Sequence, residues 1–338
     1  MSILKKILKF VGALFALLVV LLGAYAGYAV ATHEGRFRFP DTPMPKVTVS
    51  TDPEIIERGR YLTHGPAHCA QCHGGDDRDH PELLTATTPL SGGLPFILGP
   101  IGSTYSPNLT PDPETGIGAF TDEQLARTLR TGVRPNGDIS IFMRLSAATL
   151  SDEDIGAVVS YLRSQEPVRK PVPTGEWKVL GKMMVPMMGL APRSGDAPVG
   201  VQPSPEGPTV ERGAYLVESV MLCTACHSEM DPITAEIVGP RGGGSLPEPS
   251  HGDDSDMEYV APNLTSHATG VTGKLDEDAF VARIHHGRLH ASSIMPWENF
   301  HLTSDDDLRS VYRHLKSLPP VENDVGPTYR KAGWVAEE

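Results

Sequence analysis

Two short segments hold all four cysteines of the chain, and in each a histidine directly follows the second cysteine. The segments are Cys69-Ala-Gln-Cys72-His73 and Cys223-Thr-Ala-Cys226-His227. Cys-x-x-Cys-His is the spacing of covalent haem attachment, because two thiols on one side of a helical turn form thioethers to one porphyrin and the next imidazole reaches its iron. The motifs predict two covalently bound haem c groups, with His73 and His227 as axial ligands of the iron.

Two other chemistries use the same cysteine spacing, namely a structural zinc site and a redox dithiol. A zinc ribbon also takes two Cys-x-x-Cys pairs, but its pairs lie much closer together than the 151 residues that separate Cys72 from Cys223. Both motifs also carry the trailing histidine. The pattern therefore favours haem over zinc or dithiol chemistry.

The surroundings of the two motifs repeat as well. Matching pairs are Glu57-Arg-Gly-Arg-Tyr-Leu62 with Glu211-Arg-Gly-Ala-Tyr-Leu216, and Pro107-Asn-Leu-Thr110 with Pro262-Asn-Leu-Thr265. The repeat predicts two tandem domains, each with its own core, at residues 52–168 and 209–321. A linker rich in Pro and Gly (169–208) would join them, and a tail (322–338) would follow. A glycine repeated inside a helix needs a packing reason, so we expect the last helix of each domain to cross there.

The elements that position the motifs read as helices. Asp52 followed by Pro53 marks the start of one, and residues 121–131 and 277–286 predict a matching pair. Each half closes with an apolar stripe of helical period, preceded by Ser151-Asp-Glu-Asp154 or Thr303-Ser-Asp-Asp306, which have the spacing of a capping box. The sequence predicts a mainly α protein.

A late methionine in each half is the candidate second iron ligand. Met143 lies 70 residues after His73 and Met295 lies 68 residues after His227, each just before the closing helix, where a loop could cover the distal face. A neutral thioether stabilises reduced iron. Met230 and Met257 compete in the second half, but Met295, followed by Pro296, fits best. The rival histidines, which we expect to be mostly solvated, are His64, His68, His80, His285, His286 and His290.

The N-terminus has the pattern of a membrane span. Lys5, Lys6 and Lys9 precede 21 uncharged residues, 10–30, which are enough to cross a bilayer with the N-terminus in the cytoplasm. A cleaved signal peptide is the alternative, because Ala24-Tyr-Ala26 resembles a cleavage site. The length of the run favours an uncleaved anchor, and both interpretations export the chain. Residues 31–51, polar and proline-containing, would form a tether.

Charge and composition limit the classes of molecule that this protein is expected to bind. The net charge is −13, and without the three N-terminal lysines 26 basic residues face 42 acidic ones, a net charge of −16. Such a surface argues against nucleic acid and favours protein partners with a basic docking face. The apolar middle of the linker, residues 177–190, contains Met183, Met184, Met187 and Met188. Packing against the domains or the membrane surface is favoured there over metal binding.

At these residues the chain resembles a known family. Two class I cytochrome c domains in tandem are similar to the cytochrome c subunits of membrane-bound alcohol, aldehyde and gluconate dehydrogenases, and residues 108–118 match that group especially well. The resemblance implies that Cys69, Cys72, His73 and Met143 hold one haem, and that Cys223, Cys226, His227 and Met295 hold the other. This chain departs from the group in three ways. Those subunits commonly carry three haem motifs and this chain has two, and they are usually anchored near the C-terminus whereas this chain has an N-terminal anchor. They also usually have proline where this chain has Arg144.

These features together predict a dihaem cytochrome c in the bacterial inner membrane, with a single N-terminal span and soluble domains in the periplasm. It would pass single electrons between redox partners such as a membrane dehydrogenase, a quinol-oxidising complex or a terminal oxidase, without catalytic residues of its own. One alternative is an electron-transfer subunit of a membrane-bound dehydrogenase or respiratory complex. Another is a dihaem peroxidase, which needs an open sixth position on one iron.

Overall fold

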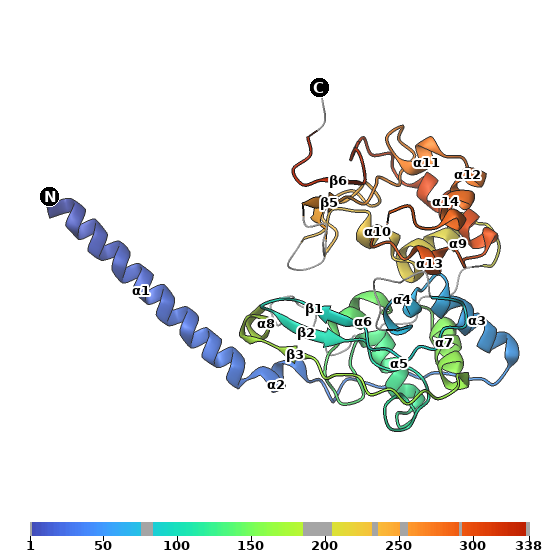
Figure 1. The fold of residues 1–338 in the computed structure, drawn as a ribbon, viewed down its shortest axis with the longest axis horizontal. Helices are drawn as coiled ribbons and strands as arrows, with labels where there is room; N and C mark the ends of the chain where they lie inside the picture. The colour runs from blue at the N-terminus through green and yellow to red at the C-terminus, as the bar shows by residue number, and fades with distance from the viewer. Residues whose placement is uncertain are drawn as a thin grey trace.

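A long N-terminal helix projects from a body made of two halves (Figure 1). The computed structural model describes residues 2–75, 84–184, 205–231, 236–250, 256–290 and 293–335. The helix, α1 (Ser2–Ala31), is followed by an N-terminal half (residues 32–184) and a C-terminal half (residues 205–335), which pack side by side. Helix α1 has the length and hydropathy of a membrane span over residues 3–31, properties that signal sequences share.

The two halves contain similar elements in a similar order. The N-terminal half contains α2 (His33–Phe37), α3 (Pro53–His64), α4 (Cys69–His73), β1 (Pro95–Ile97), β2 (Gly102–Tyr105), α5 (Asp122–Thr131), α6 (Ile141–Ser146), α7 (Asp152–Ser164), β3 (Glu176–Trp177) and α8 (Val179–Met184). The C-terminal half contains α9 (Val210–Tyr215), the π-helix η3 (Leu216–Val220), α10 (Cys223–Cys226), β4 (Glu248–Pro249), β5 (Met257–Tyr259), α11 (Val271–Lys274), α12 (Glu277–His286), α13 (Trp297–Phe300), α14 (Asp305–Ser317) and β6 (Tyr329–Lys331).

The helix starts that capping residues predicted are confirmed, with one exception. The Asp52 carboxylate accepts from the Glu54 amide at 2.9 Å and Pro53 opens α3, as predicted. Ser151 caps α7 by accepting from the Asp154 amide at 3.1 Å. The prediction for α14 was wrong by one residue, because Ser304 rather than Thr303 is its cap and accepts from the Asp307 amide.

The repeated glycine marks a close helix crossing in both halves, as predicted. A Cβ atom on Gly59 would lie 2.0 Å from the backbone oxygen of Ala157 in α7. One on Gly213 would lie 1.9 Å from the backbone oxygen of Ser310 in α14. No side chain fits at such distances, so the α3–α7 and α9–α14 crossings both require glycine.

Each half also contains a small antiparallel sheet that the helical pattern did not reveal. The strand orders are β1-β2-β3 and β4-β5-β6. In each sheet the last strand follows the closing helix, so part of the presumed linker (β3) and part of the tail (β6) belong to the folded halves.

The segment after α1 is not a free tether. Phe37 is buried, the Phe39 amide donates to the Gly137 carbonyl at 2.7 Å, and the Ser50 amide donates to the Ser160 hydroxyl at 2.9 Å. Residues 37–50 therefore lie along the N-terminal half and fix it close to the end of α1.

The two halves do not have separate cores, contrary to the expectation from the repeat. A single cluster of buried side chains includes Leu62, Val158 and Tyr161 from one half and Leu216, Leu308 from the other. Mutations in one half can therefore affect the packing of the other.

Candidate functional site

The two Cys-x-x-Cys-His motifs each start a short helix directly after a strained residue. His68, before Cys69, has φ 42°, and Leu222, before Cys223, has φ 56°. Among the residues that the structure describes, these are the two non-glycine residues in the left-handed region. Such conformations cost energy and cluster at functional sites, and here both turn the chain immediately before a motif.

The motif histidines are held in one tautomer. Nδ1 of His73 donates to the Pro107 carbonyl at 2.9 Å, and Nδ1 of His227 donates to the Pro262 carbonyl at 2.9 Å. Since a carbonyl only accepts, the proton sits on Nδ1 and the Nε2 lone pair is left for a metal. Both imidazoles are buried, and burial lowers the pKa of His73 to about 4 and also lowers the pKa of His227. Both rings are therefore neutral and ready to bind iron at ordinary pH.

The thiols are not activated as a reactive dithiol would be. Desolvation raises the pKa of Cys69 and of Cys223 to about 12 and also raises the pKa of Cys226, whereas a reactive dithiol needs a stabilised thiolate. The four cysteines, all in described segments, are not joined by disulfides. Across the described segments, no three His, Cys, Asp or Glu side chains converge to hold a metal ion. The donor set fits thioether attachment of haem.

The repeated Pro-Asn-Leu-Thr segments explain the placement of the two proline carbonyls. The Asn108 side chain accepts from the Thr110 amide at 2.9 Å and donates to the Val168 carbonyl, beyond α7, at 2.8 Å. Asn263 makes the same two contacts, with Thr265 at 2.9 Å and the Val321 carbonyl at 2.7 Å. Each asparagine thus ties the proline that orients the histidine to the end of the closing helix.

A backbone hydrogen bond also holds each motif histidine in place. The Gly92 amide donates to the His73 carbonyl at 2.8 Å, and the Gly244 amide donates to the His227 carbonyl at 2.9 Å. Gly92 has φ 65° and a Cβ there would meet the backbone of Pro107 at 2.4 Å, so glycine is required.

The candidate distal ligands lie in different local structures. Met143 is in helix α6, rather than in the expected loop, and Met295 directly precedes Pro296 and α13. Both side chains are half-buried and pack against the shared core. Of the competing methionines, Met257 is a residue of strand β5. Iron ligation by Met143 and Met295 remains a prediction.

An arginine clamps the segment that carries Met295. The guanidinium of Arg288 binds both carboxylate oxygens of Glu298, at 2.8 and 2.7 Å, and donates to the Ser293 and Met295 carbonyls. The indole of Trp297 donates to the Ser293 hydroxyl at 3.0 Å. These contacts hold the segment on both sides of Met295, and no sequence motif predicts them.

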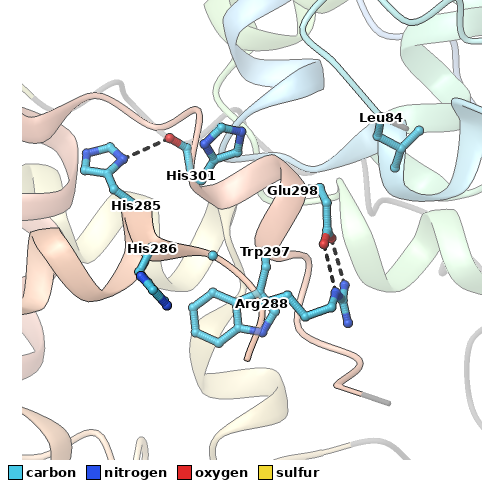
Figure 2. Close-up of a pocket in the computed structure, with 8 residues that line it drawn as sticks. Leu84, His285, His286, Arg288, Trp297, Glu298 and His301 are labelled. Carbon is cyan, nitrogen blue, oxygen red and sulfur yellow. Dashed lines mark hydrogen bonds and ion pairs between the residues drawn. The ribbon is translucent and has the colours of Figure 1, made fainter. Parts of the chain in front are cut away.

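A surface pocket of 330 Å³ adjoins this clamp (Figure 2). It is lined by Leu84, His285, His286, Gly287, Arg288, Trp297, Glu298 and His301. Its one ionised pair, Arg288 with Glu298, is engaged in the clamp, so that glutamate is not poised as an acid or base.

The rival histidines have other partners. His64, expected to be solvated, is buried: its Nδ1 donates to the Thr85 carbonyl at 3.1 Å and its Nε2 accepts from the Tyr161 hydroxyl at 2.8 Å. Burial lowers its pKa to about 4. The His68 ring packs edge-on against Phe300 of the other half, with centroids 5.5 Å apart. His80, like Met187 and Met188, lies outside the described residues.

His285 has a structural counterpart in the N-terminal half. Its ring nitrogens lie 2.9 Å from the His301 carbonyl and 2.9 Å from the Asp305 carboxylate. Arg130 makes the corresponding contacts with the Ala148 carbonyl, at 2.9 Å, and with the Asp152 carboxylate, at 2.5 Å. Both side chains join the end of a middle helix to the start of the closing helix, so His285 has a structural role.

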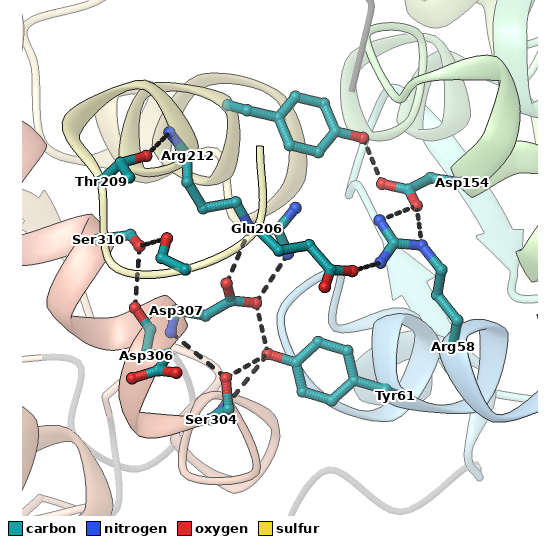
Figure 3. A network of polar contacts seen from close by, with 12 residues as sticks. Arg58, Tyr61, Asp154, Glu206, Thr209, Arg212, Ser304, Asp306, Asp307 and Ser310 are labelled. Atoms are coloured by element: carbon teal, nitrogen blue, oxygen red, sulfur yellow. Dashed lines mark hydrogen bonds and ion pairs between the residues drawn. The ribbon is translucent and has the colours of Figure 1, made fainter. Parts of the chain in front are cut away.

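A polar network joins the halves between the two sites (Figure 3). The Tyr61 hydroxyl donates to Asp307 across the boundary, and Tyr215 donates to Asp154 in the opposite direction. Within each half the same aspartates bind an arginine, Asp154 with Arg58 and Asp307 with Arg212. The repeated Glu-Arg-Gly-x-Tyr-Leu segment thus builds the contact between halves as well as the helix crossing.

A further contact connects the two sites directly. Helix α13, which follows Met295, touches α4, which contains the first motif. The Asn299 side chain donates to the His64 carbonyl at 2.7 Å across this boundary. The distal segment of the second site therefore packs against the attachment helix of the first.

Comparison with known proteins agrees with this geometry. Residues 56–166 match the family model of cytochrome c. The chain is 31% identical to the cytochrome c subunit of the alcohol dehydrogenase (quinone) of Gluconobacter oxydans (strain 621H) over 295 residues, which cover 80% of this chain and 56% of that protein. It is 29% identical to the gluconate 2-dehydrogenase cytochrome c subunit of Pantoea cypripedii over 276 residues, 78% of this chain and 59% of that protein.

A third relative has nearly the same extent. The chain is 26% identical to the "Diheme cytochrome c-type" protein of Cereibacter sphaeroides over 305 residues, which cover 81% of this chain and 92% of that protein. By contrast, it spans less than two thirds of the two dehydrogenase subunits. From the matched motifs, the oriented histidines and these relatives, we conclude that the chain belongs to the cytochrome c family.

Proposed function

We propose that the protein is a membrane-anchored dihaem cytochrome c that passes single electrons between redox partners. The observation that supports this most directly is the pair of equivalent histidines, each with Nδ1 bound to a proline carbonyl at 2.9 Å. The proposed domains are residues 52–168 and 209–321, extended by the strands that follow each closing helix. A helix of spanning length, α1, would anchor them at the periplasmic face of the inner membrane.

Each domain would hold one haem with its own four residues. The first set is Cys69, Cys72, His73 and Met143, and the second set is Cys223, Cys226, His227 and Met295. A bound haem supplies iron that alternates between ferric and ferrous states and so accepts and releases one electron. The chain would attach the group through its thiols, would present the imidazole that a proline carbonyl orients, and would offer the methionine thioether as the second iron ligand.

The contact between halves supports electron exchange inside one chain. His68 directly precedes the first attachment cysteine, and its ring packs against Phe300, five residues after Met295. The Asn299 side chain binds the His64 backbone next to this pair. An electron that enters at one site would therefore reach the other through a packed boundary.

The partner that the comparisons favour is a dehydrogenase in the same membrane. The relatives named above include cytochrome c subunits of alcohol and gluconate dehydrogenases, and another is a fructose dehydrogenase cytochrome subunit. The acidic exported part, with a net charge of −16 after removal of three lysines, would dock on a basic face. The chain would thus act as an electron-transfer subunit or as a carrier that leads to a respiratory acceptor.

Haem counting and redox titration test this function. A pyridine haemochrome titration should give two haems per chain, and denaturing gels should retain haem on the polypeptide. A potentiometric titration should then resolve two one-electron steps, and detergent extraction should co-purify a dehydrogenase. One haem per chain, or haem that acid acetone extracts, would contradict the proposal. A high-spin haem that reacts quickly with peroxide would favour the peroxidase alternative instead.

A further inference from the structure

Helix α8 packs against the far end of α1. The Tyr25 hydroxyl donates to the Met183 carbonyl at 2.9 Å, although 158 residues separate the two in sequence. Tyr25 and Ala26 are half-buried and Ala29 is fully buried, whereas the preceding part of α1 is exposed. The linker segment is therefore fixed to the last two turns of α1.

The position of Tyr25 along α1 sets the depth of this contact. The uncharged run starts at Phe10, and a helix rises 1.5 Å per residue, so Tyr25 lies about 22 Å further along the axis. The hydrocarbon core of a bilayer is about 30 Å thick. A chain anchored by α1 along the bilayer normal therefore carries the α8 contact about 8 Å below the outer edge of the hydrocarbon core, close to the interface where tyrosine is enriched.

The surface at this depth is apolar. Val179, Leu180 and Met184 of α8 are 51%, 39% and 41% exposed, and Ile97 of β1 is 67% exposed. We call these four residues the foot.

Helix α8 and the β1–β2 turn form one unit. The Lys178 amide donates to the Ile101 carbonyl at 3.0 Å, and its ammonium group donates to the Gly99 carbonyl at 3.1 Å. A Cβ on Gly181 would lie 2.2 Å from the Ile101 carbonyl, so α8 and the turn are in direct contact. In Figure 1, this unit lies at the end of the N-terminal half that faces α1.

We propose that the foot inserts into the outer interfacial layer of the lipid bilayer beside α1. This proposal rests on the proposed function in one respect, the retention of α1. A short helix with exposed apolar side chains, with Lys182 inside it and Lys178 directly before it, suits the boundary between acyl chains and head groups. The foot gives the N-terminal half a second attachment point and so fixes its orientation on the membrane.

A nitroxide label on the full-length holoprotein in lipid nanodiscs tests the insertion. Since the four native cysteines would be bound in thioethers, Leu180→Cys would provide the one labelling site, and Val238→Cys, 61% exposed in the C-terminal half, is the matched control. The haem would be kept reduced, because low-spin ferrous iron does not broaden the nitroxide signal. Power saturation then measures how accessible the label is to oxygen, which concentrates in lipid, and to a nickel chelate, which stays in water.

We expect the ratio of oxygen to nickel-chelate accessibility to be several-fold higher at position 180 than at position 238. Equal, water-like ratios at both positions would overturn the proposal, and so would a label at 180 that neither reagent reaches, since protein would then cover it. Intact mass and haem content of the same sample separate this result from failure of the proposed function. A mature chain that starts at Gly27 would show that α1 is cleaved.

Discussion

The hydroxyl of Tyr61 donates a 2.8 Å hydrogen bond to the carboxylate of Asp307, which belongs to the other half of the molecule. In the reverse direction, the hydroxyl of Tyr215 donates a 2.5 Å hydrogen bond to the carboxylate of Asp154 in the N-terminal half. Each hydroxyl also accepts from the amide of the cap residue of the closing helix, Ser304 at 3.2 Å or Ser151 at 3.0 Å. The two closing helices therefore begin at the boundary between halves, and each is capped partly by the other half.

The first prediction is that loss of either hydroxyl weakens the boundary. Tyr61→Phe and Tyr215→Phe should each lower the free energy of unfolding by about 1–2 kcal/mol, because a buried acceptor loses its donor. Urea unfolding followed by far-UV circular dichroism measures this. Tyr105→Phe is the control, because its hydroxyl makes no hydrogen bond with the described residues. A change no larger than that of the control would contradict the prediction.

The first prediction has a corollary at alkaline pH, because the same tyrosines are protonated only up to a limiting pH. Burial, with a further contribution from the facing aspartate, raises the pKa of both Tyr61 and Tyr215 above the ordinary value near 10. The unfolded chain thus loses these protons first, so stability is complete below pH 10 and falls as the pH rises above it. Unfolding of the double Tyr→Phe variant should depend less on pH in this range.

The second prediction concerns the helix crossings. Gly59→Ala or Gly213→Ala places a methyl group 2.0 or 1.9 Å from a backbone oxygen, so the helices must separate. We expect a loss of about 3 kcal/mol in the free energy of unfolding. Gly35→Ala in α2 is the control, since a Cβ there meets nothing within 4 Å. Alanine variants at 59 and 213 as stable as this control would show that the crossings adapt without cost.

The third prediction concerns the iron ligands. Met295→Ala should abolish the near-infrared sulfur-to-iron band of one haem, lower its reduction potential and open it to carbon monoxide, while the other haem keeps its own sulfur-to-iron band. Met143→Ala should do the same at the first site. His64 is not a replacement ligand there, because both its ring nitrogens are engaged. Met44→Ala, at an exposed methionine, is the control. An unchanged band in Met295→Ala or Met143→Ala would exclude that methionine as a ligand.

The fourth prediction is that Arg288 holds the Met295 segment. Lysine cannot reproduce the two-pronged bond to Glu298, so Arg288→Lys should weaken the segment by about 2 kcal/mol. The sulfur-to-iron band of the second haem should then disappear at a lower temperature than in the unmodified protein. Arg241→Lys, in a more exposed pair with Glu218, should leave the band unaffected. If the band disappeared at the same temperature in both variants, Arg288 would not be what holds the Met295 segment.

The fifth prediction is an acid-dependent loss of stability through His64. Burial lowers its folded pKa to about 4, below the ordinary value of 6.5, so the unfolded chain binds this proton first. The contribution is complete above pH 6.5 and is lost as the pH falls toward 4, by up to about 3 kcal/mol. In His64→Gln, the free energy of unfolding measured in urea should depend less on pH over this range than in the unmodified protein. His286→Gln, at an exposed histidine, should keep the pH dependence of the unmodified protein.

The motifs and the helices could be predicted from the sequence because both depend on local patterns. Helix α12 spans residues 277–286 as predicted, and Asp52 caps α3. The error at Thr303 arose because two hydroxyls stand side by side. The spacing between halves resolves it, since Ile155 and Leu308 are 153 residues apart, as are Ser151 and Ser304.

The sheets and the contact between halves depend on distant partners and could not be predicted in this way. Strand β3 has two residues and pairs with β2 across more than 70 positions, so no local alternation marks it. The repeated tyrosines were visible as a pattern, but their partners lie in the other half. Arg288 stands in no motif, and its role follows only from the fold of the segment around it.

The exchange of tyrosines has a consequence for how the two halves of the chain can differ. When two identical subunits form a symmetric dimer, each gives the other the same residues, and Tyr61 with Tyr215 does this here. The two halves of this chain are therefore related to each other as the subunits of a symmetric homodimer are. Because both halves belong to one chain, equivalent positions can hold different residues. Arg130 and its counterpart His285, which make equivalent contacts with an aspartate, are an example. Under the proposed function, one half could thus suit an electron donor and the other an acceptor, while the reciprocal tyrosine contacts keep the two halves paired.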